Sequence, residues 1–297
     1  MEIGQLRYFL RIAELGTFTR AGEELGMTQP ALSRAVAKLE EELGQPVFER
    51  RARRIELTDA GRMLQTRAEQ ILALVDDTLA ELGDSETTGA VRVGAIPTIA
   101  PYLLPIVLRD FRDRLPGVHV VAYEETTDKL LHRCNQGEVD VAVMAAPIVG
   151  RYLEAETLFE EELFAVLPTG HPLAARKTIS LADLRQQPFV LLDDTHCLSE
   201  TILSFCRQRA FQPVAIQHTC QLATVEELVS LGHGVSLIPR MARNADTSDR
   251  RVYRPISAPT PTRTVVMIWN PYRFQSKRMK RLQECLRRTA KTNGAKR

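Results

Sequence analysis

TFTRAGEELGMTQPALSRAVAKLEEEL (residues 17–43) has the pattern of two short helices joined by a tight turn. Its apolar residues recur at steps of three and four, the spacing that places a stripe on one helix face. They are Ala21, Leu25, Leu32, Val36, Leu39 and Leu43. Gly26 ends the first helix, whereas Thr28 and Pro30 suit the N-cap and the first turn of the second. The stretch therefore predicts a helix-turn-helix.

The second helix of this pair presents polar side chains near its start, namely Gln29, Ser33, Arg34 and Lys38. Such side chains bond base edges and phosphates when a helix end enters the major groove of DNA. An ordinary αα-hairpin with a solvated polar face has the same pattern. The segment by itself leaves both interpretations open.

The positive charge around this segment is local. Residues 1–58 hold nine Lys or Arg and nine Asp or Glu, but four arginines gather just after Phe48. They are Arg50, Arg51, Arg53 and Arg54. Because DNA phosphates respond to a local patch, we expect this cluster to contact the backbone. A second basic cluster, at residues 275–297, has the pattern of a frayed, solvated tail.

The composition is that of a globular protein of about two domains. Of its 297 residues 44% are hydrophobic and 26% charged, without a long uncharged apolar run, so we expect a cytoplasmic protein without a signal peptide or membrane span. Its five cysteines lack CxxC or zinc-knuckle spacing. We therefore expect mostly reduced thiols, no metal site and no cofactor.

A long helical pattern follows the basic cluster, capped by Thr58 and covering residues 59–82. Its residues at alternating steps of four and three form the seam of a coiled coil. They are Leu64, Ala68, Ile71, Val75, Thr78 and Leu82. Such a helix pairs with a second copy of itself, and docking on its own domain is the alternative. Earlier helical patterns cover residues 3–15, 18–25 and 29–43.

Beyond the polar stretch at residues 83–90, short β-rich runs alternate with helical stretches such as residues 103–115. The runs are residues 91–96, 118–123, 139–144, 162–168, 188–192, 214–219, 235–238 and 264–269. This alternation predicts α/β units with mainly parallel sheets. About 200 residues of such units suit two sub-domains with a ligand cleft at the strand ends.

The helix-turn-helix with TQPALSRAVAKLEEELG (28–44), then PVFERRARRIELTDAG (46–61) and the long helix, resembles the N-terminal domain of LysR-type transcriptional regulators. The remainder is similar to the α/β effector domain of that family, which is related to periplasmic binding proteins. The implied domains are a winged helix-turn-helix at 1–58, a dimerising linker helix and hinge at 59–88, and an effector domain at 89–297. Its implied sub-domains are about 89–161 with 265–297, and about 162–264.

This resemblance implies a DNA-binding regulator rather than an enzyme, usually a tetramer built from dimers, that binds interrupted palindromes near promoters. The residues that would lie at bases or nearby phosphates are Thr28, Gln29, Pro30, Ser33, Arg34 and Lys38. The arginines after Phe48 would belong to a wing that reaches the backbone. Its expected partners are double-stranded promoter DNA, a second copy of the chain, RNA polymerase, and hydrogen peroxide or another small effector.

Within the effector domain, IPTIAPYLLP (96–105) and DDTHCLSETILSFC (193–206) resemble the peroxide-sensing OxyR branch of the family. There a reactive cysteine in a His-Cys-Leu motif precedes a resolving cysteine by nine residues, which implies Cys197 as sensor and Cys206 as its partner. The residues implied around the peroxide are Thr98, Thr127, His196, Ser199 and Glu200. That branch follows His-Cys-Leu with Arg-Asp, so an arginine that could stabilise a thiolate is missing at Ser199.

A helix beginning near Cys197 would place this thiol at the positive helix end beside His196, which favours the thiolate. Peroxide would convert it to a sulfenic acid, which a second thiol condenses to a disulfide. Nine helical residues rise about 13 Å, whereas a disulfide allows Cα atoms at most about 7 Å apart. The bond would therefore require the 197–206 helix to unravel.

Three alternatives remain open at this stage. Cys206 lies among apolar residues, as an inert core cysteine would. The signal could instead be a metabolite in the cleft between the sub-domains, contacted by Thr98. A solute-binding or enzymatic α/β protein is the third, although the sequence has no signal peptide, nucleophile elbow or phosphate loop.

Overall fold

The computed structural model describes residues 1–51, 54–82, 85–148, 152–193, 196–211, 213–219 and 221–294. The chain divides into two compact units, Met1–Gly83 and Asp84–Arg297. The first unit has one apolar core and the second has two. Among the helices in these ranges, none combines the length and apolar character that a membrane crossing requires.

The first unit has its helices at the predicted residues. Its elements are α1 (Ile3–Leu15), α2 (Phe18–Leu25), α3 (Gln29–Leu43), the hairpin of β1 (Phe48–Arg51) and β2 (Arg54–Leu57), and α4 (Asp59–Leu82). Leu32 and Leu39 of α3 are fully buried, as their spacing predicts. The Thr58 hydroxyl caps α4 by accepting a hydrogen bond from the Gly61 N–H at 2.9 Å. Thr28 precedes α3, but its hydroxyl makes no capping bond to the described backbone.

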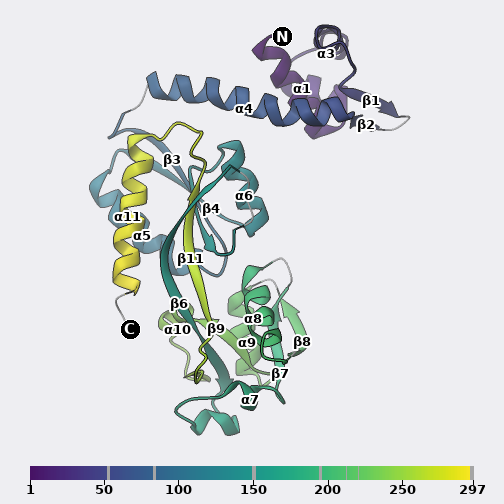
Figure 1. Ribbon diagram of the computed structural model, residues 1–297. Coiled ribbons are helices and arrows are strands. Elements are labelled where there is room, and N and C mark those ends of the chain that lie inside the picture. The colour runs from purple at the N-terminus through teal and green to yellow at the C-terminus, as the bar shows by residue number, and fades with distance from the viewer. Residues whose placement is uncertain are drawn as a thin grey trace. The chain divides into compact units, whose positions relative to one another are not determined.

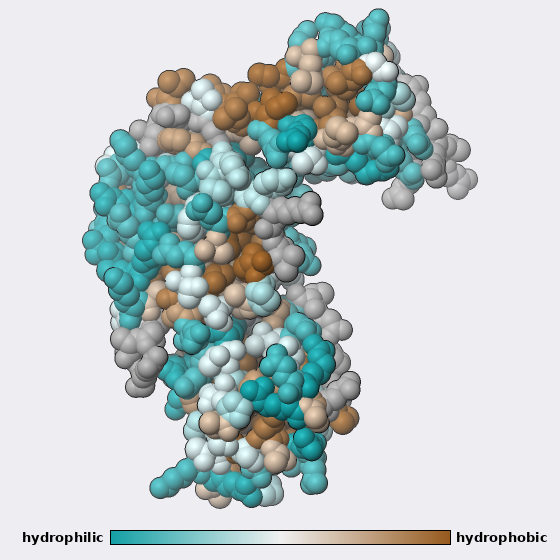
Figure 2. Space-filling view, in the orientation of Figure 1, coloured by the Kyte–Doolittle hydropathy of each residue, from teal (hydrophilic) through white to brown (hydrophobic). Residues whose placement is uncertain are grey.

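The long helix α4 has a docked part and an exposed part. Ala68 is buried in the core of the first unit, and Leu64 packs against that core. Further along, Leu74 is 65% and Leu82 is 83% exposed, and Figure 2 shows apolar side chains gathered over this helix. The start of the predicted seam thus packs on its own domain, which was the alternative to pairing, while its later part stays exposed.

The second unit alternates strands and helices (Figure 1). Its strands are β3 (Gly89–Ala95), β4 (Val118–Glu124), β5 (Val141–Ala145), β6 (Glu154–Pro168), β7 (Pro188–Leu192), β8 (Val214–Thr219), β9 (Ser236–Pro239), β10 (Arg251–Pro255) and β11 (Thr262–Trp269). Its helices are α5 (Ala100–Arg114), α6 (Thr127–Gln136), α7 (Leu181–Leu184), α8 (Cys197–Arg207), α9 (Leu222–Ser230), α10 (Arg240–Ala245) and α11 (Lys277–Gly294), with a 3-10 turn η1 at Pro172–Ala175. All eight predicted strands are present. The sequence pattern missed β10, a short edge strand whose arginines hide its β character.

The expectation of mainly parallel sheets is wrong. The main sheet has the order β10-β6-β11-β5-β3-β4, with β9 also beside β6. In it β3 runs parallel to β4 and β5, whereas β11 is antiparallel to β5 and β6, and β6 is antiparallel to β9 and β10. A separate pair, β7 and β8, is parallel. The chain leaves one half of the unit on β6 and returns on β11 beside it, which makes these two strands antiparallel (Figure 1).

The two cores of the second unit lie on either side of this crossing. One collects buried side chains from residues 91–159 and 265–290, and the other from residues 163–256. Around the first core, α5 and α11 lie together on one side of the sheet and α6 on the other (Figure 1). Both long strands, β6 and β11, contribute to the first core, and β6 continues into the second.

The C-terminal basic cluster belongs to a packed helix and not to a frayed tail as expected, at least through residue 294. Leu282 and Leu286 of α11 are fully buried in the first core. Arg287 donates to the Glu156 carboxylate at 2.7 Å, and its neighbour Arg288 pairs with Asp110. These arginines are therefore neutralised within the unit itself.

A buried ion pair joins the end of α10 to β10. Arg251 donates from Nε and Nη2 to the two carboxylate oxygens of Asp246, both at 2.7 Å. Burial alone would raise the pKa of Asp246, but hydrogen bonds from Arg251 and Tyr253 lower it to about 2. Because this pKa lies below its ordinary value, the carboxylate stabilises the fold above about pH 4, and that contribution is lost as the pH falls towards 2.

We expect Asp246→Asn to lower the free energy of unfolding by about 3 kcal/mol at pH 7, because Arg251 would lose its bidentate partner in a buried site. Urea unfolding of the full chain, followed by the fluorescence of its single tryptophan, Trp269, measures this loss. The difference from the wild type should shrink between pH 4 and pH 2. Asp249→Asn, an exposed neighbour, is the control, and an equal loss in both variants would contradict the prediction.

Candidate functional site

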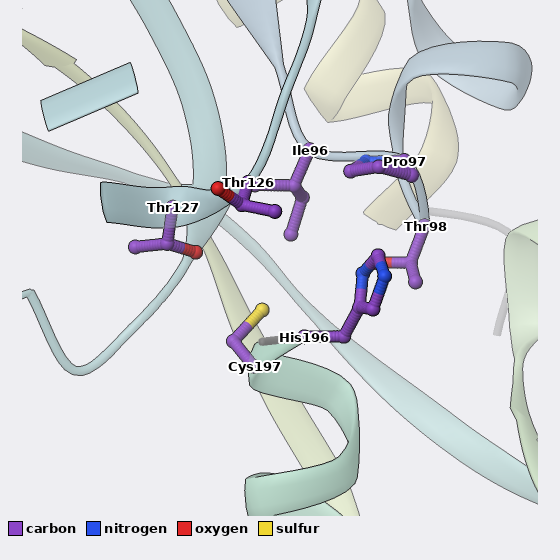
Figure 3. Close-up of a pocket in the computed structure, with 7 residues that line it drawn as sticks. All are labelled: Ile96, Pro97, Thr98, Thr126, Thr127, His196 and Cys197. Atoms are coloured by element: carbon purple, nitrogen blue, oxygen red, sulfur yellow. The ribbon is translucent and has the colours of Figure 1, made fainter. Parts of the chain in front are cut away.

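A small pocket lies where three segments of the second unit meet: the turn after β3, the start of α6 and the start of α8 (Figure 3). Its lining residues are Ile96, Pro97, Thr98, Thr126, Thr127, His196 and Cys197. The pocket is a narrow crevice, with about 180 Å³ of space when the adjoining open solvent is included. The structure thus brings together four of the residues proposed from sequence, from segments far apart in the chain: Thr98, Thr127, His196 and Cys197.

Cys197 is the first residue of α8 and is half-buried, and its sulfur faces the pocket (Figure 3). His196 occupies the N-cap and is itself buried, with its Nε2 3.8 Å from Asp193 Oδ1. The first N–H groups of a helix lack intrahelical acceptors and carry partial positive charge, which stabilises an anion there. The predicted helix start at this cysteine is confirmed.

Thr127, at the start of α6, offers the pocket a hydroxyl. Its Oγ1 is buried and has no hydrogen-bond partner among the described residues. Figure 3 shows this oxygen on the side of Thr127 that faces the Cys197 sulfur. Since buried hydroxyls normally have a partner, this one is available to a ligand beside the sulfur.

Thr98 is buried and is held by Arg263 of β11. The Arg263 guanidinium donates from Nη1 to Thr98 Oγ1 at 2.9 Å and from Nη2 to the Thr98 carbonyl at 3.1 Å. Its third bond goes to Glu161 of β6 at 2.8 Å. Because a guanidinium only donates, the Thr98 hydroxyl keeps its own proton for an acceptor elsewhere, including one in the pocket.

Sequence reasoning missed Thr126, Arg263 and Glu161. Arg263 stands at the head of the apolar run TVVMIW (264–269), and a charge beside a buried strand was the one signal available for it. Glu161 lies in the acidic run EEE (160–162), and its one signal is strand alternation, which places it on the same face as Phe159 and Leu163.

Ser199 and Glu200 lie outside the pocket lining, although the sequence interpretation had included them. The Ser199 hydroxyl is buried and donates to the Leu192 carbonyl at 2.6 Å. Glu200 is exposed and pairs with Arg207 further along α8. The carboxylate that would oppose a thiolate at Cys197 is therefore engaged with an arginine on its own helix.

The two cysteines of α8 belong to different cores. Cys206 is fully buried in the second core, on a stripe with Leu198 and Ile202 at four-residue steps. Cys197 packs against the first core. Burial raises the pKa of the Cys206 thiol to about 11, so this thiol is unreactive where it lies.

In the first unit, α3 presents most of the residues proposed for DNA. Four of them are exposed just before the helix or in its first two turns: Thr28, Gln29, Pro30 and Arg34. Ser33 is half-buried, and Lys38 is exposed but donates to Glu2 at 3.1 Å, which raises the pKa of Lys38. In the hairpin that follows, Arg53 lies outside the described residues. For Arg50, Arg51 and Arg54 the structure describes the backbone strands only.

Residues 84–291 match the LysR substrate binding domain, and residues 3–62 match the bacterial regulatory helix-turn-helix protein of the lysR family. The chain belongs to the LysR family. It is 37% identical over 270 residues to a probable hydrogen peroxide-inducible genes activator of Streptomyces viridosporus, covering 89% of this chain and 86% of that protein. It is 30% identical over 291 residues to the DNA-binding transcriptional dual regulator OxyR of Escherichia coli K12, covering 97% and 95%.

Among solved structures, this LysR-family chain is similar to a hydrogen peroxide-bound OxyR mutant of Corynebacterium glutamicum. The TM-score is 0.65 at 30% identity, with 99% of this chain and 96% of that chain covered. The fold predicted from sequence, a winged helix-turn-helix with an α/β effector domain, is confirmed.

We expect Cys197 to be alkylated at least 100-fold faster than the other described cysteines in the reduced protein at pH 8. Cys134, Cys206 and Cys285 are buried, and their burial raises each pKa, to about 12, 11 and 11 respectively. Timed iodoacetamide labelling followed by peptide mass spectrometry measures the rates. Comparable alkylation rates at Cys197 and Cys206 would contradict the conclusion that Cys206 is buried and unreactive while Cys197 is accessible.

Proposed function

We propose that this protein is a sequence-specific DNA-binding transcriptional regulator that senses hydrogen peroxide by reversible oxidation of Cys197 and Cys206. The observation that carries the proposal is the Cys197 sulfur at the start of α8, in a pocket with Thr98 and the unpartnered Thr127 hydroxyl. The relatives named above, a peroxide-inducible genes activator and OxyR, support it. We infer a regulator in the cytoplasm, where bacterial promoter DNA lies, and not an enzyme.

The chemistry balances with one peroxide and two thiols. The Cys197 thiolate attacks one peroxide oxygen, the S–O bond forms, and the O–O bond breaks with loss of hydroxide, which takes up a proton to become water. The Cys206 thiol then attacks the Cys197 sulfur, the S–O bond breaks, and the sulfur-bound oxygen leaves as water while the disulfide forms. Thr98 and Thr127 can donate hydrogen bonds to the peroxide oxygens during the first step.

The position of Cys206 makes the second step depend on a conformational change. Within α8 the two cysteines are separated by about 13 Å of helical rise, and Cys206 lies in a different core. A disulfide requires Cα atoms within about 7 Å. The helix must therefore unravel and release Cys206 from its core, and this rearrangement would be the signal passed on by the effector domain.

The narrowness of the pocket weighs against a metabolite. Pockets for drug-sized ligands run from about 300 to 1,000 Å³. The pocket beside Cys197 is a tight crevice, far smaller than such sites, so a metabolite would require it to open. The metabolite-responsive regulator is therefore the weaker candidate.

For the output, we propose that α3 reads bases through Gln29, Ser33 and Arg34, with Thr28, Pro30 and Lys38 beside the backbone. The arginines of the hairpin, Arg50, Arg51, Arg53 and Arg54, would form the wing on the phosphates. The exposed apolar side of α4 would pair with a second copy, giving dimers and then tetramers. We also propose domain limits at residues 58 and 88 and two sub-domains in the second unit; the two separate cores of that unit support the sub-domains.

We expect Cys197→Ser to abolish the peroxide response and Cys206→Ser to stop the reaction at the sulfenic acid. Treating the reduced protein with one equivalent of peroxide should give a Cys197–Cys206 bridge, detected by mass mapping without reduction. Cys134→Ser is the control, because Cys134 is buried in the first core and should leave the bridge unchanged. Normal regulation by Cys197→Ser, without a bridge in the wild type, would disprove redox sensing.

We expect Arg34→Ala to weaken promoter-DNA binding about tenfold, the loss typical of one good base or phosphate contact. Lys38→Ala, on the same helix, should weaken it less, because Lys38 already pairs with Glu2. Fluorescence anisotropy at several salt concentrations measures both affinities and their salt dependence. Equal DNA affinities for the two variants and the wild type would contradict the proposal that α3 contacts DNA.

A further inference from the structure

Glu161 and Arg263 form a buried ion pair next to the pocket. They lie opposite one another on the antiparallel strands β6 and β11, and their side chains are 2% and 0% exposed. Glu161 Oε2 accepts a hydrogen bond from Arg263 Nε at 2.8 Å, and Oε1 accepts one from the Met241 backbone N–H at 2.6 Å. Both carboxylate oxygens have donors, so the carboxylate is fixed in place.

The guanidinium of Arg263 joins this pair to the pocket wall. Its two terminal nitrogens donate to the hydroxyl and the carbonyl of Thr98, which lines the pocket with Cys197. An arginine stays charged throughout the physiological pH range, and buried charges are poorly screened. The potential in the pocket therefore depends on how far Glu161 cancels the charge of Arg263.

We infer that Glu161 is a positioning residue of the sensor, which fixes Arg263 against Thr98 and limits the fraction of Cys197 present as thiolate. The inference rests on the proposed function and deepens it. Glu161 sets the sensitivity to peroxide by opposing the positive charge that would otherwise favour the nucleophile. The motif lacks an arginine at Ser199, and Arg263 on β11 supplies a positive charge at the pocket wall instead. The Glu161 carboxylate partly neutralises that charge.

The other charged groups on the segments around the pocket are paired or exposed. They are Asp193, 3.8 Å from His196; Glu125, paired with Arg133; Glu200, paired with Arg207; and the exposed Glu124, Asp128 and Lys129. Among the described residues, Arg263 is the buried charge that hydrogen-bonds a lining residue. Removing the charge of Glu161 should therefore change the electrostatic potential at Cys197.

Glu161→Gln tests the inference, with Glu162→Gln as the matched control. Glu162 is the next residue on β6, pairs with Arg240 and is 41% exposed. The readout is the pH dependence of Cys197 alkylation by iodoacetamide in the reduced full-length protein, followed on the Cys197 peptide. We expect Glu161→Gln to lower the pH at which Cys197 alkylation is half-maximal, the midpoint, by about one unit. Below that pH, peroxide should oxidise Cys197 about tenfold faster than in the wild type. Glu162→Gln should change neither.

Glu161→Asp separates charge from packing, because it keeps the charge but withdraws the carboxylate by one methylene. We expect it to retain the wild-type midpoint. Should Glu161→Gln fail to fold, Arg263→Gln supplies the test, because removing the positive charge should raise the midpoint, and an unchanged midpoint would overturn the inference. A folded Glu161→Gln with the wild-type midpoint, or an equal downward shift in Glu161→Asp, overturns the inference. If Glu161→Gln shifts the midpoint but peroxide leaves wild-type Cys197 unoxidised, the proposed function falls while the effect of the ion pair on the thiol stands.

Discussion

The antiparallel pairing of β6 with β11 is the constraint on which the second unit depends. The chain passes from one core to the other on β6 and returns on β11, so these strands fix how the two halves face each other. The pocket draws Thr98 and Thr127 from one half and Cys197 from the other. Because Glu161 and Arg263 face one another across the same two strands, the crossing that joins the cores also holds the pocket wall.

The helix that carries the cysteines is stable only through its packing. An isolated helix of eleven residues is marginal in water, so α8 depends on its stripe of Leu198, Ile202 and Cys206 in the second core. Just beyond its end, Ala210 adopts a left-handed conformation with φ 52°, at a cost of about 1 kcal/mol. A disulfide closing a loop of about ten residues contributes on the order of 3 kcal/mol. Both terms favour the unravelled form, whereas the burial of the stripe in the second core opposes it.

Local patterns in the sequence predicted the helices and most strands, because helical and strand periodicity are properties of neighbouring residues. A helix beginning near Cys197 was likewise considered from the local sequence, and α8 begins there. What failed were properties set by distant residues. The direction of β11 depends on where the chain returns, and Arg263 becomes part of the site only because β11 lies beside β6. Ser199 was expected to line the pocket, but its hydroxyl donates to the Leu192 carbonyl and it is not among the lining residues.

The charge balance of the first unit bears on how a redox signal could reach DNA. Residues 1–58 carry equal numbers of acidic and basic side chains, so one copy has no general attraction for the duplex and must depend on a few local contacts. Two linked copies bind far more tightly than one, provided that their spacing matches the two half-sites. The exposed apolar residues of α4, such as Leu74 and Leu82, are the groups whose burial against a second copy would set that spacing. A rearrangement that alters the pairing of two such helices would therefore change DNA occupancy without altering any residue of α3.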